Sequence, residues 1–173
     1  MPILVHMATA IKRVEPAENE FLASLEARSK QPSPFLRVMA NRPEVLKNFP
    51  PFYGAIAGAG SVDRRIKEEV YLATSFTNKC AFCTAAHVAG ARKAGLSDDE
   101  IAAIREERDA GFSEAERAAL AYARELARTA NAAATRDALR GHFTDEQVVE
   151  ITLVIAMANF TNRFNNGLEV LPE

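Results

Sequence analysis

Apolar residues recur at helical spacing along most of the chain, and no stretch shows the strict alternation expected of a half-buried strand. Glycines and prolines stand between these apolar segments, where they mark turns. The pattern therefore predicts an all-α protein. A chain of 173 residues is long enough for one hydrophobic core, so we expect a tail or arm over residues 1–16 and one domain over residues 17–173.

The first part of the chain predicts short helices separated by proline-containing turns. A helix is expected over residues 18–28, and a loop over residues 29–34. Residues 35–60 are typical of one or two helices broken at the prolines, because proline lacks the backbone donor and restricts the residue before it.

The middle of the chain predicts two helices joined by a tight turn. An apolar stripe indicates a helix over residues 64–77, which Ser61 or Asp63 can cap. A second helix begins near Cys80. It ends at Gly95, since glycine readily takes the left-handed conformation that terminates helices.

Three further helix starts have the capping-box spacing, in which serine or threonine is followed three residues later by glutamate or glutamine. The last of these helices, from Asp145 to about Phe164, is apolar nearly all round, so we expect it to be the buried core helix. The three capping pairs are Ser97 with Glu100, Ser113 with Glu116, and Thr144 with Gln147.

Composition and charge narrow the class of protein. The net charge is −2 and no run of lysine or arginine stands out, which argues against nucleic acid as the main partner. The longest apolar run, residues 151–160, is far shorter than the ~20 residues of a membrane helix. No secretory signal is recognisable at the N-terminus. We therefore expect a cytoplasmic protein that does not bind membranes.

The two cysteines of the chain lie three residues apart, and a histidine follows four residues later. On a helix, Cys80, Cys83 and His87 share one face. Cys80 falls in the first turn, where free N–H groups and the helix dipole favour a thiolate. His87 lies one turn after Cys83, where its ring can accept the thiol proton. In a reducing cytosol such a pair is more often catalytic or metal-binding than a structural disulfide.

Three explanations are open for these residues. They can be packing residues, since cysteine is often buried. They can supply three ligands of a zinc site, although no second ligand pair stands elsewhere in the sequence. A dithiol redox centre explains the most, and it needs a group that handles protons. Glu68 and Glu69 on the preceding helix are the candidates, and helical periodicity does not choose between them.

The stretch "EEVYLATSFTNKCAFCTAAH" resembles the signature of the alkylhydroperoxidase D and carboxymuconolactone decarboxylase superfamily. A glutamate precedes the C-x-x-C motif by twelve residues, and a histidine follows it by four. The resemblance extends from about Phe35 to the last helix and includes "ANFTNRFNNGLEV", an ending seen in peroxidase-related members. It implies an all-α, single-domain bundle of helical hairpins that assembles into a homo-oligomer, a trimer or a hexamer.

The same resemblance implies a role for each site residue. Cys83 is implied as the thiol that attacks the peroxide. Cys80 is implied as the more exposed thiol, which resolves the sulfenic acid as a disulfide and meets the reductant. Glu68, rather than Glu69, is implied as the carboxylate of a proton relay that His87 completes. The implied mechanism uses no cofactor and no metal, and its reductant is a lipoyl-type or thioredoxin-like dithiol.

One position departs from the family pattern. The best-characterised hydroperoxidase has a histidine just before the second cysteine, where this chain has Phe82. We therefore expect a more apolar pocket and a less complete proton relay. The decarboxylase branch lacks the cysteine pair, which argues against decarboxylation.

The resulting hypothesis is a thiol-dependent peroxidase that reduces organic hydroperoxides in antioxidant defence, with hydrogen peroxide as a further candidate substrate. The alternatives are a redox sensor or disulfide-exchange protein of the same fold, and a zinc-binding helical domain.

Overall fold

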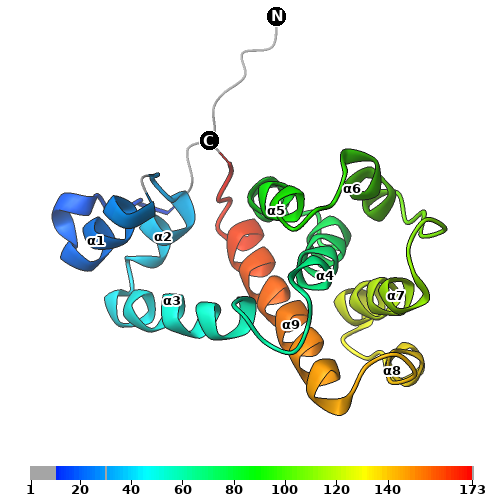
Figure 1. Cartoon of the computed structure of the whole chain (residues 1–173). Coiled ribbons are helices and arrows are strands. Elements are labelled where there is room, and N and C mark those ends of the chain that lie inside the picture. Colours follow the sequence, from blue (N-terminus) through cyan, green and yellow to red (C-terminus); the bar gives the residue numbers. More distant parts are fainter. Residues whose placement is uncertain (1–10, 30, 173) are drawn as a thin grey trace, which may run out of the picture.

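The computed structural model describes residues 11–29 and 31–172, and the regular elements in these two ranges are all helical. This confirms the all-α prediction. A short 3-10 turn (Pro16–Glu18) comes first. The α-helices follow in chain order (Figure 1) as α1 (Glu20–Ser29), α2 (Pro34–Met39), α3 (Pro43–Ala57), α4 (Arg64–Thr77), α5 (Ala81–Lys93), α6 (Asp98–Arg105), α7 (Glu114–Thr129), α8 (Ala133–Leu139) and α9 (Asp145–Gly167).

Helix α4 lies at the centre of the bundle, where it packs against α5, α6, α7 and α9 (Figure 1). Every residue from 67 to 75 is buried, whichever way its side chain points. Three of these residues, Lys67, Glu68 and Glu69, are of acidic or basic types. Lys67 forms an ion pair with Glu150 of α9, so the burial of α4 depends on paired charges as well as on apolar packing.

The prediction that the last helix is the buried core helix is correct for one side of α9 only. α9 packs against α3, α4, α5 and α7, but Val149, Leu153 and Phe160 remain exposed. Hydropathy predicts too much burial for α9 and too little for α4. The reason is that the buried charged residues of α4 are of types that usually lie on the surface. No described helix, α9 included, combines the length and hydropathy of a membrane span.

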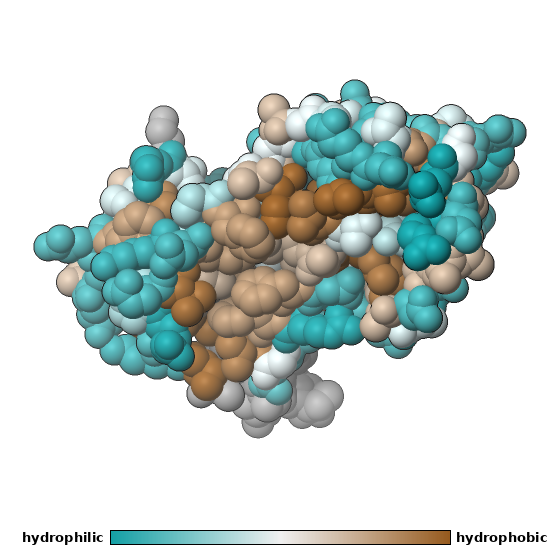
Figure 2. All heavy atoms as spheres, turned by 90° about the horizontal axis from the view of Figure 1, so that it is seen from below, coloured by the Kyte–Doolittle hydropathy of each residue, from teal (hydrophilic) through white to brown (hydrophobic). Residues whose placement is uncertain are grey.

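Exposed apolar side chains gather on one face of the molecule, over α3 and α9 (Figure 2). They line a groove of about 580 Å³. We call this surface the α3–α9 patch and define it by Val45, Phe52, Leu153 and Phe160. Contiguous exposed apolar surface of this kind marks interaction sites in soluble proteins.

Helix α3 continues through Pro50 and Pro51, which corrects the expectation that the chain breaks at these prolines. The break falls earlier, between α2 and α3, where Pro43 occupies the first helical position. Pro50 and Pro51 each leave a carbonyl without its helical donor. The helix persists because Leu46 and Ile56, on either side of the prolines, are each buried in one of the two apolar cores of the protein.

Helices α1 and α2 form a second, smaller apolar core with the start of α3 and the C-terminal segment. The described part of the predicted arm lies against it. The Val14 N–H donates to the Arg37 carbonyl at 3.1 Å, and the Asn41 amide donates to the Lys12 carbonyl at 2.7 Å. Residues 1–10 of the arm lie outside the described residues, and the domain boundary at residue 17 stays a prediction.

The helix starts follow the predicted capping signals. Asp63, not Ser61, caps α4, by accepting from the Arg65 N–H at 2.7 Å. The Ser61 hydroxyl instead donates to Glu150 at 2.6 Å. The three capping boxes form as predicted, with the pairs Ser97–Glu100, Ser113–Glu116 and Thr144–Gln147.

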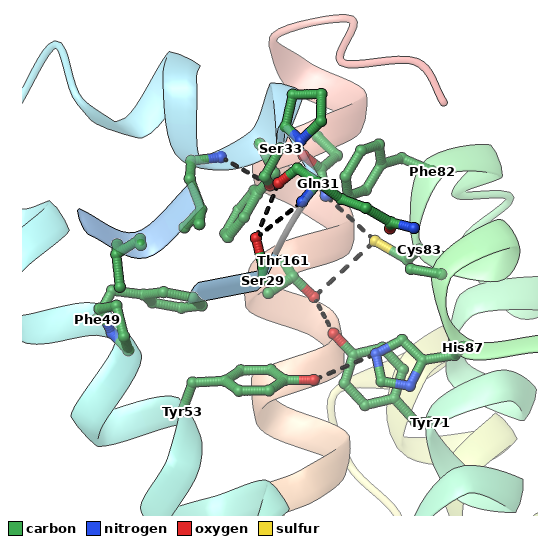
Figure 3. Close-up of a pocket in the computed structure, with 17 residues that line it drawn as sticks. Ser29, Gln31, Ser33, Phe49, Tyr53, Tyr71, Phe82, Cys83, His87 and Thr161 are labelled. Atoms are coloured by element: carbon green, nitrogen blue, oxygen red, sulfur yellow. Dashed lines mark hydrogen bonds between the residues drawn. The ribbon is translucent and has the colours of Figure 1, made fainter. Parts of the chain in front are cut away.

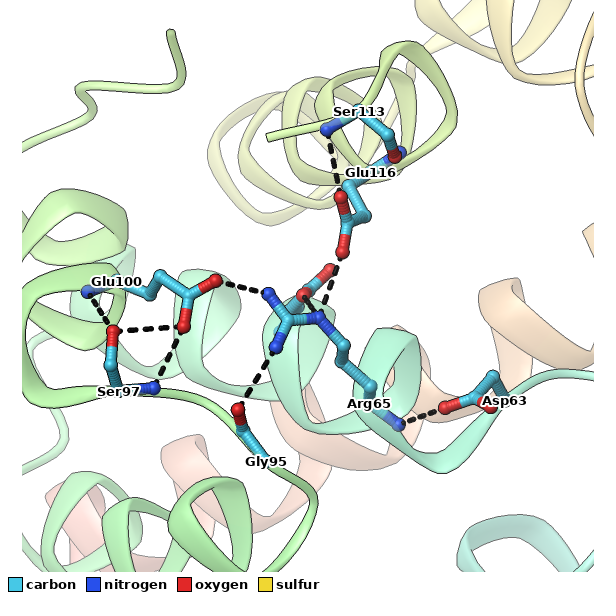
Figure 4. Close-up of polar contacts among 8 residues, drawn as sticks. Asp63, Arg65, Gly95, Ser97, Glu100, Ser113 and Glu116 are labelled. Carbon is cyan, nitrogen blue, oxygen red and sulfur yellow. Dashed lines mark hydrogen bonds and ion pairs between the residues drawn. The ribbon is translucent and has the colours of Figure 1, made fainter. Parts of the chain in front are cut away.

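Two of the capping glutamates also bind one arginine of α4 (Figure 4). Arg65 Nη2 donates to Glu100 at 2.5 Å, and Arg65 Nε donates to Glu116 at 2.9 Å. Oε1 of Glu69 lies 3.0 Å from the same Nε. We call these four residues the Arg65 cluster. It joins α4 to the first turns of α6 and α7.

The cysteine helix α5 starts and ends where the sequence predicts. Cys80 is its N-cap, and the Cys80 sulfur accepts from the Cys83 N–H at 3.3 Å. Gly95 has a φ of +93°, just past the helix end, in the region that favours glycine. α5 then packs against α4 and α9, which brings the thiols to the middle of the bundle.

Candidate functional site

The two thiols meet at the N-terminus of α5, inside the protein. Cys80 and Cys83 are both free thiols, 1% and 3% exposed, and their Sγ atoms are 2.6 Å apart. The Cys80 thiol donates to the Cys83 sulfur. A disulfide bond is about 2.05 Å long, so only a small approach of the two atoms is needed to form one.

Cys83 is the more acidic of the two thiols. Hydrogen bonds from Cys80 and from the Asn165 amide, whose Nδ2 lies 3.2 Å from the sulfur, lower the pKa of Cys83 to about 6 in spite of its burial. The same contact with Cys83, together with burial, raises the pKa of Cys80. When the pair loses a proton, the negative charge therefore rests on Cys83, where the Cys80 thiol holds it.

His87 is turned toward α3 and α4 rather than toward the thiols. Its Nδ1 lies 2.8 Å from Glu68 Oε2, and its Nε2 lies 3.2 Å from the Tyr53 hydroxyl (Figure 3). Its ring stacks on Tyr71, with the centroids 3.4 Å apart. The described contacts of His87 include no hydrogen bond to Cys83. This corrects the expectation of direct contact: helical spacing places the two residues on one face, but these partners draw the ring away.

Two tyrosine hydroxyls connect His87 with Cys83 instead. Burial raises the pKa of Tyr53 to about 12 and also raises the pKa of Tyr71, so both hydroxyls keep their protons. The two tyrosines also interact with each other. The Tyr71 hydroxyl lies 2.6 Å from Thr161 Oγ1, which is 4.0 Å from the Cys83 sulfur (Figure 3). A polar path therefore runs from Cys83 through Thr161, Tyr71 and Tyr53 to His87.

A neutral His87 ring fits its contacts in one tautomer. Because Tyr53 stays protonated, its hydroxyl can donate to Nε2, which leaves Nδ1–H to donate to Glu68. Arg64 holds the other oxygen of Glu68, with Nη2 3.0 Å from Oε1. Gly90 lies against the same carboxylate, and a Cβ there would come within 2.7 Å of Glu68 Oε1. The Glu68–His87 pair is thus fixed from three sides.

A cavity of about 470 Å³ opens beside Cys83. Phe82, the residue that departs from the family pattern, lines this cavity and lies 6.3 Å from Phe35 between ring centroids. Ser29, Gln31 and Ser33 contribute polar groups to the lining. Five aromatic side chains form a large part of the mostly apolar wall (Figure 3): Phe35, Phe49, Tyr53, Tyr71 and Phe82. The cavity suits an apolar organic molecule that reaches Cys83.

The structure brings the predicted site residues together as two pairs, Cys80 with Cys83 and Glu68 with His87, joined by the tyrosine path. The expectation that Cys80 is the more exposed thiol is wrong for the described chain. Cys80 is as deeply buried as Cys83, and it is Cys83 that lines the cavity. The N-cap position turns the Cys80 sulfur back over the first turn of α5.

The structure also separates the two glutamates that periodicity leaves undecided. Glu68 lies against His87, whereas Glu69 is fully buried in the Arg65 cluster. The Nε hydrogen of Arg65 is donated to Glu116, so neither oxygen of Glu69 receives a hydrogen bond. Burial and the charge of Glu116 raise the pKa of Glu69 to about 8.

Sequence reasoning missed four residues of the site. Thr161 and Asn165 could have been found, because they are polar residues one turn apart on a largely apolar helix, and buried polar groups usually have a partner. Tyr53 and Tyr71 carry no such signal. They reach His87 only because the folded chain brings Tyr53 of α3 and Tyr71 of α4 to the His87 ring of α5.

The zinc alternative finds no support in the geometry. Within residues 11–29 and 31–172, no three histidine, cysteine, aspartate or glutamate side chains are placed to hold a metal ion. His87 would have to leave Glu68 and Tyr53 to join the two thiols.

The part of the chain that contains most of this site matches a known protein family. Residues 43–125 match the carboxymuconolactone decarboxylase family, a region that contains the cysteines, His87 and Glu68. A solved structure from Agrobacterium tumefaciens, a protein of unknown function proposed as the antioxidant defence protein AhpD, is 31% identical. The match covers 78% of this chain and 94% of that one, with a TM-score of 0.70. The chain belongs to the alkylhydroperoxidase D and carboxymuconolactone decarboxylase superfamily.

Other solved structures share the fold over nearly the whole chain. An uncharacterized peroxidase-related protein from Ralstonia eutropha JMP134 with an AhpD core has a TM-score of 0.83 and is 23% identical, covering 97% of this chain and 94% of that one. The debrominase Bmp8, solved as a cysteine-to-alanine variant in complex with 2,3,4-tribromopyrrole, has a TM-score of 0.81 and is 20% identical, covering 96% of this chain and 93% of its own. α9, with Thr161 and Asn165, lies outside the region that matches the carboxymuconolactone decarboxylase family.

Proposed function

We propose that this protein is a thiol-dependent peroxidase that reduces organic hydroperoxides through the Cys80–Cys83 dithiol. The observation that carries the proposal is the 2.6 Å contact between two buried thiols, with Cys83 facing a mostly apolar cavity that five aromatic side chains help to line. Membership of a superfamily that includes an antioxidant defence candidate supports it.

The chemistry follows from the more acidic thiol. The Cys83 thiolate attacks the terminal oxygen of the hydroperoxide, an S–O bond forms and the O–O bond breaks. Sulfur is oxidised to a sulfenic acid, and the peroxide is reduced to an alkoxide that leaves as the alcohol once protonated. The Cys80 thiol then attacks the sulfenic sulfur, and a disulfide and one water are formed.

The Glu68–His87 pair manages the proton in this scheme. The proton that leaves the Cys83 thiol passes along the hydroxyls to His87, where it forms an imidazolium beside the Glu68 carboxylate. Tyr53, which lines the cavity, returns it to the alkoxide. Because the tyrosine path reaches the cavity from α3 and α4, the relay does not need the histidine that Phe82 replaces.

The cycle closes with a dithiol donor of the lipoyl or thioredoxin type, which reduces the disulfide and is itself oxidised. A cytoplasmic setting suits this step, because a reducing compartment supplies such donors. Since both sulfurs are buried in the reduced chain, the donor reaches the disulfide either through the cavity beside Cys83 or after the start of α5 moves.

A turnover assay with cumene hydroperoxide and dihydrolipoamide tests the proposal. Cys83→Ser should lower the rate of peroxide loss by about a thousandfold or more, because the nucleophile is gone. Cys80→Ser should still react with one equivalent of peroxide but should not turn over. Ala81→Ser, an exposed position in the same helical turn, is the matched control.

Full turnover in either cysteine variant would contradict the mechanism. Slow reaction with every peroxide, combined with fast thiol–disulfide exchange, would favour the redox-sensor alternative. Hydrogen peroxide serves as the comparison substrate, and the apolar cavity predicts that it reacts more slowly than cumene hydroperoxide.

Reductive debromination of an aromatic ring is a second candidate, favoured by the aromatic cavity walls beside Cys83. The thiolate would take the bromine, a proton would replace it on the ring, and Cys80 would then displace bromide from sulfur to form the same disulfide. Bromide release from 2,3,4-tribromopyrrole, with dihydrolipoamide present, measures this activity directly.

We also propose that the chain forms homo-oligomers, trimers or hexamers, through the α3–α9 patch. Exposed aromatic and aliphatic side chains from two helices can pack against a different surface of the next copy, and a head-to-tail contact of this kind can close a symmetric ring. Leu153→Glu should lower the mass measured by light scattering. Leu171→Glu, which changes an exposed leucine outside the patch, should leave the mass unchanged. An unchanged mass for Leu153→Glu would contradict the proposal.

A further inference from the structure

Asn165 places a buried amide against the reacting sulfur. It stands on α9, one turn after Thr161, and is 2% exposed. Its Nδ2 donates to the Cys83 sulfur at 3.2 Å. A thiol sulfur is a weak acceptor and a thiolate is a strong one, so this contact favours the charged form of Cys83.

The other end of the same amide has no partner. Asn165 Oδ1 is buried and accepts no hydrogen bond. Asn162, three residues earlier, is satisfied at both ends: its Oδ1 accepts from Asn78 at 3.0 Å, and its Nδ2 donates to Ser75 at 3.1 Å. Asn162 also lowers the pKa of Cys83, but both ends of its amide are engaged, whereas Asn165 keeps a free acceptor beside the thiol.

The orientation of the amide follows from charge. If the side chain were flipped, Oδ1 would face the thiolate and the two would repel each other. The other polar neighbour on α9 does not replace it. Thr161 is 4.0 Å from the sulfur, and its hydroxyl is engaged with Tyr71 and with the backbone carbonyls of Met157 and Ala158. Asn165 is thus the α9 residue that donates directly to Cys83.

We propose that Asn165 is a catalytic residue that acts on Cys83 in two successive states. Before the reaction its Nδ2–H holds the thiolate, and after the reaction its Oδ1 accepts the O–H of the sulfenic acid formed on the same sulfur. This inference rests on the proposed peroxidase function. The attack forms the S–O bond, breaks the O–O bond and oxidises the sulfur by two electrons, and the alkoxide takes the proton held at His87.

The thiolate and the sulfenic acid of Cys83 need opposite hydrogen-bonding groups from the same side chain. The thiolate offers only lone pairs and needs a donor, whereas the sulfenic acid brings a donor of its own and needs an acceptor. A planar amide presents both, and the acceptor that is orphaned in the reduced chain becomes satisfied once the sulfenic acid forms. The later attack of Cys80 removes that oxygen as water and releases the amide again.

Alkylation of Cys83 tests the thiolate half without any peroxide. In a Cys80→Ser background the rate of reaction with iodoacetamide is measured against pH. Asn165→Ala should move the midpoint upward by about one unit or more, because a hydrogen bond to a charged group is lost. Asn165→Asp, which exchanges the donor for a negative charge, should move it further. Asn159→Ala is the matched control, since Asn159 contacts Asn78, Arg163 and the Ile155 carbonyl rather than sulfur.

Dimedone trapping tests the sulfenic half in the same background. After one equivalent of cumene hydroperoxide, the trappable sulfenic acid should disappear faster in Asn165→Ala than in the parent, and at the parental rate in Asn159→Ala. A parental alkylation profile in Asn165→Ala, in protein shown to be folded by circular dichroism, would overturn the proposal. Asn165→Ser provides the same comparison if the alanine variant does not fold.

The two measurements also separate this inference from the proposed function. A shifted alkylation midpoint together with no reaction toward any peroxide would support the role of Asn165 at the thiolate and would contradict the peroxidase. Normal peroxide reduction together with an unshifted midpoint would support the peroxidase and would contradict the role of Asn165 at the thiolate.

Discussion

Glu68 and Glu69 are neighbours on α4, yet they belong to two polar centres of opposite character. Glu69 lies in the Arg65 cluster, where one guanidinium joins three carboxylates and the first turns of two helices (Figure 4). Glu68 lies in the thiol site, where His87, two tyrosines and Thr161 lead to a cavity (Figure 3). Two adjacent residues of α4 therefore belong to different centres: Glu69 to a cluster that supports the fold, and Glu68 to a site built for chemistry.

The difference is in how the charges are satisfied. In the Arg65 cluster, burial alone would raise the pKa of Glu116, but hydrogen bonds from Arg65 and Ser113 lower it to about 2. The hydrogen bonds with Glu116 and Glu100 raise the pKa of Arg65 in turn. The thiol site instead keeps an acidic thiol, a free amide oxygen and a histidine held between Glu68 and Tyr53. The unsatisfied carboxyl of the Arg65 cluster, Glu69, is fully buried, whereas the groups of the thiol site line a cavity and are available for reaction.

The largest expected effect comes from removing the arginine. Arg65→Ala leaves Glu69, Glu100 and Glu116 facing one another without a counter-charge, so the free energy of unfolding should fall by about 3 kcal/mol. Urea unfolding measures this. The peroxidase activity of the remaining folded protein should be retained, because Arg65 does not contact the thiol site.

The control for that change is Arg92→Ala, which breaks the exposed ion pair between Arg92 and Asp98. It should lower the free energy of unfolding by no more than about 0.5 kcal/mol. Equal effects of the two arginine variants would contradict the view that the Arg65 cluster supports the fold.

A change at Gly90 of α5, which lies against Glu68, should affect activity more than stability. Gly90→Ala places a Cβ 2.7 Å from Glu68 Oε1 and should push the carboxylate off His87, which lowers kcat about tenfold or more. Gly54→Ala, also within a helix but with nothing near its Cβ, should instead raise the free energy of unfolding by about 0.5 to 1 kcal/mol. Adding Glu68→Asp to Gly90→Ala should recover part of kcat, and full activity of Gly90→Ala alone would contradict this role.

The smallest effect is a pH dependence of stability with opposite sign at the two centres. The pKa of Glu69 in the folded chain, about 8, exceeds its ordinary value of 4.5, so the folded state binds the extra proton. This stabilisation is complete below pH 4.5 and is lost as the pH rises through 8. The pKa of Cys83 in the folded chain, about 6, lies below its ordinary value of 9. That stabilisation is complete above pH 9 and is lost as the pH falls through 6.

Urea midpoints between about pH 5 and pH 9 separate the two contributions. In the parent protein, Glu69 should make the free energy of unfolding fall as the pH rises, and Glu69→Gln should abolish that fall. Cys83 should make the free energy of unfolding increase as the pH rises, and Cys83→Ser should abolish that increase. Identical pH profiles for Glu69→Gln and the parent would show that the buried carboxyl is not protonated in the folded chain.

Local signals in the sequence predicted the helix ends well. The capping boxes and the glycine stop are each contained within a few residues, so they can be recognised without tertiary information. Helix burial was predicted less well. α4 carries Lys67, Glu68 and Glu69 and is still buried all round, because partners from other helices pair with those charges. α9 is more apolar, but one of its sides is exposed to solvent.

The thiol pair was recognisable because its residues share one turn of one helix. The tyrosine path was not, because Tyr53, Tyr71 and Thr161 come from three helices whose packing decides where they meet. The position of His87 shows the same limit. Spacing along α5 predicted contact with Cys83, but stacking on Tyr71 and the bond to Glu68 fix the ring elsewhere.

The Arg65 cluster also has a consequence for motion. Because one side chain closes the first turns of α6 and α7 onto α4, those helix ends cannot fray one at a time. We expect their backbone amides to exchange with deuterium as one cooperative unit with α4, while α1 and α2, which belong to the smaller core, exchange independently and faster. The start of α5 lies beside this slow unit, so the thiols can rearrange during a cycle while the helix that carries Glu68 stays in place.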